Sequence, residues 1–257
     1  MATSPIQIAS PNFTGGRNNY RPEAIVIHIM EGSLSGTDSW FKSRISSVSA
    51  HYGIGKDGEI HQYVQEKDSA WHAGRVNAPS WNLIKPAGNN SYKNPNFYTI
   101  GIEHEGTGNS EWTDAMYESS SSLIAEIVQR WNIPIDRDHI IGHHEIYSLK
   151  TCPGFKVDLN KLIDLSRKKA GYNRSFTITA KTGSVKTTNQ LRIRTGTPST
   201  KAPVLRVLGI GEVIDYTGYT DEGQEVDGIT RWYKTAKGNW IWGGGVKEVK
   251  DAVTILV

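Results

Sequence analysis

The spacing of apolar residues changes character near residue 170, and this change limits the chain to two unlike domains. From residue 24 to residue 169, short apolar runs alternate with segments of helical periodicity. The clearest helical segment is 113–131, in which these residues recur at helical spacing: Leu123, Ile124, Ile127, Val128 and Trp131. After residue 175 the helical spacing is lost, and short alternating stretches are separated by Gly, Pro, Thr and Asn. We therefore predict a first domain over 1–170, a linker over 171–175 and a second domain over 176–257.

The first domain is predicted to be α/β, with a mixed central sheet flanked by helices. Its expected strands are 24–29, two strands within 51–64 that meet at an Asp-Gly turn, 98–104, and one that begins at residue 140. Its expected helices are a short one that Thr37 opens as the cap, 113–131 and 158–169. The second domain is predicted to be a small all-β barrel.

Composition excludes several classes of protein. Apolar residues make up 37% and charged residues 21% of the chain, as in ordinary soluble globular proteins. No apolar run reaches the about 18 residues of a membrane span, and the first seven residues lack the features of a secretory signal peptide. Basic residues are too sparse for a nucleic-acid binder. Residues 174–257 carry 12 Lys and Arg against 8 Asp and Glu, which suits an anionic polymer such as a bacterial wall or an ordinary solvated surface.

Three residues far apart in the sequence carry the donor atoms that zinc prefers. His28 lies in the apolar run 24–29, whereas His143 and Cys152 lie within one short segment. Two imidazoles and one thiolate leave the fourth tetrahedral position of Zn²⁺ open, which is typical of a catalytic site. His143 and His144 are neighbours on a predicted strand, so their side chains point to opposite faces and only one of them can be a ligand. Cys152 is the only cysteine, and it is either an inert thiol or the third ligand.

Two further charged residues are expected near this cluster. In the strand 98–104, alternation places Glu103 on the face opposite the isoleucines, where a carboxylate could act as a general base. Glu105 lies two residues further along and can share that face, so alternation does not choose between the two. Cys152 precedes a proline and is therefore pushed toward an extended backbone, which puts Lys150 and Cys152 on the same side.

Five short motifs follow one another in a fixed order between about residues 20 and 165. They are His28 in its strand, Ser49-Ala50-His51-Tyr52, Ala70-Trp71-His72-Ala73-Gly74, Ile100-Gly101-Ile102-Glu103, and the segment from Gly142-His143 to Cys152-Pro153-Gly154. In this order they resemble the zinc-dependent N-acetylmuramoyl-L-alanine amidases, the superfamily of phage lysins, bacterial amidases and animal peptidoglycan recognition proteins. The resemblance implies their fold, and hydrolysis of the bond between N-acetylmuramic acid and L-alanine in bacterial peptidoglycan.

The resemblance also implies residue roles. Because the family histidine directly follows the glycine, the metal ligands would be His28, His143 and Cys152. Glu103 matches the general base of the family, and Lys150 matches a basic residue that stabilises the oxyanion. Some phage members instead use a tyrosine beside His51, where this chain has Ala50, and this departure favours the glutamate.

Trp71 and His72 resemble the wall of a substrate-binding groove in the same family. An indole can stack on a sugar or peptide face, and an imidazole can form a hydrogen bond to the muramyl peptide. The alternative is a core tryptophan beside a histidine that is satisfied by the fold. Both positions therefore remain candidates for substrate binding.

The second domain resembles bacterial Src-homology-3-type domains, which often anchor wall hydrolases to peptidoglycan. The resemblance is carried by Leu191-Arg192-Ile193-Arg194-Thr195-Gly196, Arg231-Trp232-Tyr233-Lys234 and Trp240-Ile241-Trp242. These aromatic residues could equally fill a small core, so we assign none of them to binding.

Taken together, we expect a monomeric wall-lytic amidase whose second domain binds the wall. A phage endolysin that stays in the host cytoplasm until lysis is the first expectation, and a bacterial autolysin exported by a non-classical route is the second. One rival is a non-catalytic peptidoglycan receptor on the same fold, although such receptors typically lose the cysteine ligand. The other is an amidase that acts on soluble anhydro-muropeptides, for which a wall anchor would have no use.

Overall fold

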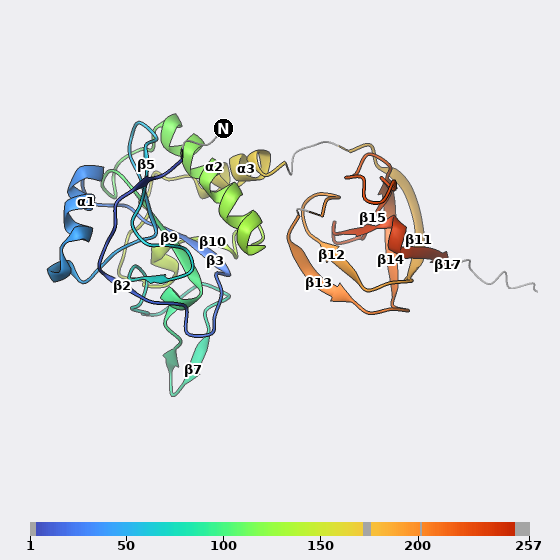
Figure 1. The fold of residues 1–257 in the computed structure, drawn as a ribbon, viewed down its shortest axis with the longest axis horizontal. Coiled ribbons are helices and arrows are strands. Elements are labelled where there is room, and N and C mark those ends of the chain that lie inside the picture. The colour runs from blue at the N-terminus through green and yellow to red at the C-terminus, as the bar shows by residue number, and fades with distance from the viewer. Residues whose placement is uncertain (1–3, 172–175, 201, 250–257) are drawn as a thin grey trace, which may run out of the picture. The chain divides into compact units, whose positions relative to one another are not determined.

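The computed structural model describes residues 4–171, 176–200 and 202–249, and the chain divides into two compact units, residues 1–170 and 171–257 (Figure 1). Most of the linker expected at 171–175 lies outside the described residues. Each helix among the described residues is too short or too polar to span a lipid bilayer.

A six-stranded sheet forms the centre of the first unit. Its strands, in spatial order, are β1 (Ile6–Gln7), β5 (Ile60–Gln62), β4 (Tyr52–Ile54), β9 (Thr99–His104), β3 (Ala24–Ile27) and β10 (Ile140–Gly142). All neighbours are parallel except β4 and β5, which pair antiparallel across the Asp-Gly turn. The strands β3 and β9 lie in the interior of the sheet and are buried almost throughout, as their apolar runs predict. The predicted mixed sheet is thus confirmed.

The helices of the first unit are α1 (Leu34–Lys42), α2 (Asp114–Trp131) and α3 (Leu159–Lys169). Figure 1 shows α2 and α3 side by side and α1 away from this pair. The hydroxyl of Thr113 caps α2 by accepting a hydrogen bond from the backbone of Met116. The predicted cap of α1 was wrong, because Ser33 caps the helix and Thr37 lies buried one turn inside it.

Short elements complete this unit. They are the paired strands β2 (Phe13–Thr14) with β6 (Ser69–Ala70) and β7 (Pro86–Gly88) with β8 (Ser91–Tyr92), and the 3-10 turns η1 (Arg44–Ser46), η2 (Pro95–Phe97) and η3 (His143–Glu145).

A hydrogen-bonded histidine fastens α1 to the sheet. His61 on β5 contacts Asp38 of α1 through Nδ1 and Glu59 through Nε2, both at 2.8 Å. The hydroxyl of Tyr63 also donates to Asp38 (2.8 Å). Although burial opposes the charge, the hydrogen bonds to the two carboxylates hold the pKa of His61 above its usual value. These hydrogen bonds to Asp38 therefore hold α1 against the sheet.

The second unit is all-β, as predicted. Its antiparallel sheet runs in the order β13 (Val204–Leu208), β12 (Leu191–Arg194), β16 (Trp240–Trp242), β15 (Trp232–Lys234), β14 (Val213–Thr220), β11 (Thr179–Thr187) and β17 (Val246–Val249), with a 3-10 turn η4 (Gly243–Gly245) before β17. Trp232, Tyr233 and Trp240 are buried in it, whereas Trp242 is partly exposed. Three of the four aromatic residues therefore fill the core.

Candidate metal centre and active site

His28 and Glu103 reach the same face of the sheet because of strand alternation. The register of β3 with β9 continues one residue beyond β3, since the backbone N–H of His28 donates to the carbonyl of Ile102 (2.9 Å). His104, which points the other way, contacts Ser120 of α2 (3.0 Å). The face with His28 and Glu103 is consequently the one that α2 leaves uncovered, and His28 Nδ1 lies 3.9 Å from Glu103 Oε1.

His143 enters the same space from the next strand. The strand β10 pairs with β3 so that Gly142 lies beside Ile27, and the ring centroids of His28 and His143 are 4.5 Å apart. The predicted continuation of this strand through His144 was wrong, because the chain turns into η3 after Gly142. The carboxylate of Glu145 accepts a hydrogen bond from the backbone N–H of Gly142 (2.8 Å) and so stabilises this turn.

Cys152 completes a cluster of three donors. Its ligand atom and those of His28 and His143 all lie within 4.8 Å of one another. His144 points away from the cluster, and both its backbone N–H (3.2 Å) and its Nδ1 (2.7 Å) contact the carbonyl of Cys152. The backbone around Cys152 forms turns in place of the predicted extended run, but Lys150 and Cys152 still line the same pocket.

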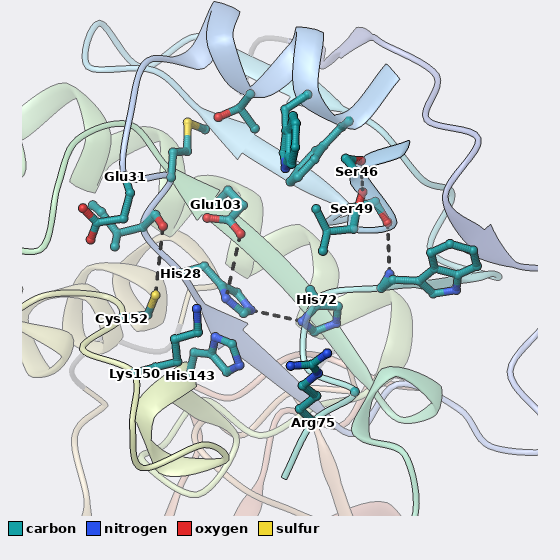
Figure 2. Close-up of a pocket in the computed structure, with 18 of the residues that line it drawn as sticks. His28, Glu31, Ser46, Ser49, His72, Arg75, Glu103, His143, Lys150 and Cys152 are labelled. Atoms are coloured by element: carbon teal, nitrogen blue, oxygen red, sulfur yellow. Dashed lines mark hydrogen bonds and ion pairs between the residues drawn. The ribbon is translucent and has the colours of Figure 1, made fainter. Parts of the chain in front are cut away.

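The seven residues singled out in the sequence line one pocket of about 970 Å³, which Figure 2 shows in close-up. They are His28, Trp71, His72, Glu103, His143, Lys150 and Cys152. Glu105, the alternative base, instead accepts a hydrogen bond from the backbone of Lys56 (2.9 Å). The fold therefore places Glu103 in the pocket and Glu105 outside it, a choice that the alternation of side chains along the strand left open.

Burial shifts the pKa values of the two histidines, Glu103 and Cys152 away from their usual values. Desolvation, reinforced by nearby cationic and imidazole groups, lowers the pKa of His28 well below its usual value and that of His143 to about 4. Both rings are thus neutral and can offer a lone pair to a metal without losing a proton. Desolvation also raises the pKa of Glu103 to about 8, against the opposing effect of Lys150, and raises the pKa of the Cys152 thiol.

The same groups fit a divalent cation. Glu103 Oε2 is buried and has no hydrogen-bond partner among the described residues. A cation beside Glu103 and Cys152 would favour their ionised forms and offset the cost of burying them. The nitrogen and sulfur donors are those that zinc prefers, and three ligands leave a coordination position open. The cluster can therefore hold a metal and keep a carboxylate next to it.

His72 has a contact that sequence reasoning missed. Its Nδ1 shares a hydrogen bond of 3.1 Å with Nε2 of His28, and its Nε2 lies 3.3 Å from the hydroxyl of Thr99. In a metal-binding imidazole, the ring nitrogen that does not bind the metal commonly forms a hydrogen bond, and this bond fixes the orientation of the ring. Trp71 and His72 both line the pocket, and their predicted part in substrate binding stays a prediction. No local pattern could have indicated the contact between His72 and His28 across 44 positions.

Replacing Gly101 with alanine is expected to weaken metal binding through His72. A Cβ atom at residue 101 would lie 2.6 Å from Cγ and Nδ1 of His72, so the ring would have to shift, and Nδ1 is the atom that contacts His28. Loss of such a partner typically lowers metal affinity by about 10- to 100-fold. Chelator competition with Zn²⁺ measures the effect, and Gly15→Ala, whose Cβ meets nothing within 4 Å, is the matched control. An unchanged affinity in the folded Gly101→Ala protein would show that His72 does not orient the ligand.

Comparison with known proteins identifies relatives of the first unit. A family model described as N-acetylmuramoyl-L-alanine amidase matches residues 18–155, a range that contains all seven pocket residues. N-acetylmuramoyl-L-alanine amidase A of Achromobacter lyticus is 39% identical over 127 residues, which are 48% of this chain and 59% of that protein. The chain thus spans little more than half of this relative.

In two further comparisons, the matched region covers nearly the whole length of the relative. The 1,6-anhydro-N-acetylmuramyl-L-alanine amidase AmpD of Haemophilus influenzae is 30% identical over 185 residues, which are 65% of this chain and 91% of that protein. A crystal structure of AmpD superposes with a TM-score of 0.52 at 26% identity, and covers 64% of this chain and 96% of that chain. The sequence match and the structural match thus point to the same group of proteins.

Proposed function

The chain belongs to the N-acetylmuramoyl-L-alanine amidase family, and from this premise we propose that it cleaves peptidoglycan with a zinc ion held by His28, His143 and Cys152. The reaction of the family is hydrolysis of the amide bond between N-acetylmuramic acid and L-alanine, so the chain is an amidase that acts on peptidoglycan. The metal, its ligands and the part that each residue plays are what we propose.

One observation carries the proposal of a metal-dependent site. Three zinc-type donor atoms lie within 4.8 Å of one another, and the buried Oε2 of Glu103 beside them has no partner in the described chain. Structural zinc sites usually have four protein ligands, whereas three ligands and an adjacent carboxylate are typical of zinc hydrolases. This arrangement favours hydrolysis over mere binding of the wall.

The mechanism assigns a task to each pocket residue. Bound zinc would lower the pKa of water to near 7 and polarise the scissile carbonyl. Glu103 accepts a proton from the attacking water at Oε2 and delivers it to the nitrogen of the departing L-alanine. The ammonium of Lys150 stabilises the negative charge that develops on the carbonyl oxygen. His72 holds His28 in orientation, and Trp71 offers its indole face to the substrate.

We assign the second unit to wall binding as a Src-homology-3-type domain. Its all-β antiparallel sheet and the net positive charge of residues 174–257 support this role. It also has a hollow of about 380 Å³, whose lining includes the exposed Arg192 and the partly exposed Trp242. The amidase would therefore act at the bacterial cell wall, with the second unit raising the local concentration of its substrate.

A soluble substrate is the second candidate. The relative from Haemophilus influenzae, most of whose length is matched, is named for 1,6-anhydro-N-acetylmuramyl-L-alanine. An enzyme that takes small diffusing fragments would not gain from a wall-binding unit. The two candidates therefore differ in what removal of residues 171–257 does to the rate.

Metal removal and a choice of substrates test the proposal together. Chelation is expected to abolish release of L-alanine amino groups from intact sacculi, and stoichiometric Zn²⁺ is expected to restore it. The full chain should outperform residues 1–170 on sacculi but not on soluble anhydro-muropeptides. Mass spectrometry of the fragments identifies the bond that is cut. Cleavage of soluble fragments alone would favour the second candidate, and activity without metal would contradict the zinc mechanism.

A further inference from the structure

Arg75 is a cation in the catalytic pocket that nothing in the described chain neutralises. It is exposed and lines the same cavity as the metal cluster. None of the hydrogen bonds or ion pairs within the described ranges involves its guanidinium, whereas Arg130, for example, is bound to Glu66 at 2.6 Å. Figure 2 shows its side chain reaching toward the space between His72 and His143. A planar guanidinium with all its donors free is well suited to bind a carboxylate through two hydrogen bonds.

The backbone that carries Arg75 is fixed on both sides. Before it, the side-chain oxygen of Asn96 accepts a hydrogen bond from the backbone N–H of Ala73 (2.7 Å). After it, the backbone N–H of Asn77 donates to the carbonyl of Ile146 (3.2 Å). The guanidinium therefore extends from a rigid base, and a ligand would not have to order a mobile loop before binding.

The pocket differs in chemistry from one side to the other. Figure 2 shows the hydroxyls of Ser46 and Ser49 on the side away from Arg75 and Lys150. Trp71 belongs to the hydroxyl side, since its backbone N–H donates to Ser49 Oγ (3.0 Å). Both hydroxyls are already bound within the fold, since Ser49 Oγ donates to the carbonyl of Asn12 and Ser46 Oγ donates to the carbonyl of Ser43 (2.8 Å). The indole of Trp71 suits an uncharged sugar, whereas the two cations suit an anionic group. The glycan and the stem peptide would thus extend to opposite sides of the metal cluster.

We infer that Arg75 binds the free α-carboxylate of the second stem-peptide residue and so selects stems whose glutamate is not amidated. In peptidoglycan the L-alanine is followed by D-glutamate linked onward through its γ-carboxyl, so its α-carboxyl is either free or present as the amide. That group lies about 7 Å or less from the scissile amide, within two residues of chain. Arg75 lines the same pocket as the metal cluster, so this carboxylate is the anionic group of the stem nearest to the scissile bond that Arg75 can meet there. The inference rests on the amidase function proposed above.

The test uses the full-length, zinc-loaded protein and two synthetic muramyl tripeptides that differ only in an α-carboxylate or an α-amide at the glutamate. The unmodified protein is expected to show a kcat/KM about tenfold higher for the carboxylate, as for a charged hydrogen bond. Arg75→Met should reduce this ratio to about one, and Arg75→Lys, which keeps the charge but loses the planar fork, should give an intermediate ratio. Arg21→Met removes an exposed arginine outside the pocket, and should keep the full ratio.

A binding measurement separates this inference from the proposed function. Calorimetry with the peptide L-Ala–D-γ-Glu–L-Lys and its α-amide reports recognition without turnover. If neither muramyl tripeptide is cleaved but the acid binds more tightly in an Arg75-dependent manner, the proposed function fails and the inference stands. If both are cleaved with equal kcat/KM, or if Arg75→Met keeps the preference, the inference is overturned and the amidase function stands.

Discussion

Replacing Cys152 with serine is expected to abolish zinc binding and amidase activity together. The thiolate is the softest of the three donors, and a serine hydroxyl stays protonated near neutral pH and binds zinc poorly. The remaining pair, His28 and His143, would not hold the metal at catalytic concentrations. Zinc supplies several kcal/mol of transition-state stabilisation, so we expect the rate to fall by about 10³-fold or more. Zinc content by mass spectrometry and release of L-alanine amino groups from sacculi measure the two effects.

The control for this variant is Thr151→Ser, a conservative change at the exposed neighbouring residue. It should retain both zinc and activity, and so exclude a general disturbance of the turn. Because Cys152 is the only cysteine, no disulfide is affected by its replacement. A Cys152→Ser protein that still carries zinc and turns over at a normal rate would remove Cys152 from the ligand set.

Replacing Glu103 with glutamine is expected to separate metal binding from catalysis. The amide keeps the shape of the side chain but cannot accept a proton, so zinc should remain bound while the general base is lost. A positioned base contributes about 10²- to 10⁴-fold to the rate, and kcat should fall by that factor. Steady-state kinetics with a soluble muramyl peptide, together with zinc content, measure the outcome.

Glu105→Gln is the matched control, because Glu105 lies two residues away but bonds to the backbone of Lys56 outside the pocket. It should change the rate little. Near-normal turnover in Glu103→Gln, or a large loss in Glu105→Gln, would assign the base to another residue. The comparison is direct because both variants replace one carboxylate by the same amide.

Much of the fold follows from local patterns in the sequence. The apolar runs indicate β3 and β9, and the helical spacing indicates α2, because the spacing of apolar residues reflects which faces of an element are buried. The Asp-Gly pair indicates the turn between β4 and β5, because these residues suit a tight hairpin turn. Errors occur where competing local interactions decide the boundary. Ser33 caps α1 in place of Thr37, and Glu145 turns the chain at Gly142 before the predicted strand can continue.

For the site, local sequence patterns were enough to predict the donor types, their order and the strand faces on which His28 and Glu103 lie. Alternation along a strand is a property of the backbone and needs no knowledge of its neighbours. Three features of the site needed the three-dimensional structure: Glu103 and not Glu105 lines the pocket, His72 contacts His28, and Arg75 lines the same pocket without an ion-pair partner among the described residues. These contacts depend on the register between strands and on the paths of loops, which bring together residues far apart in the chain and leave no periodic trace in the sequence.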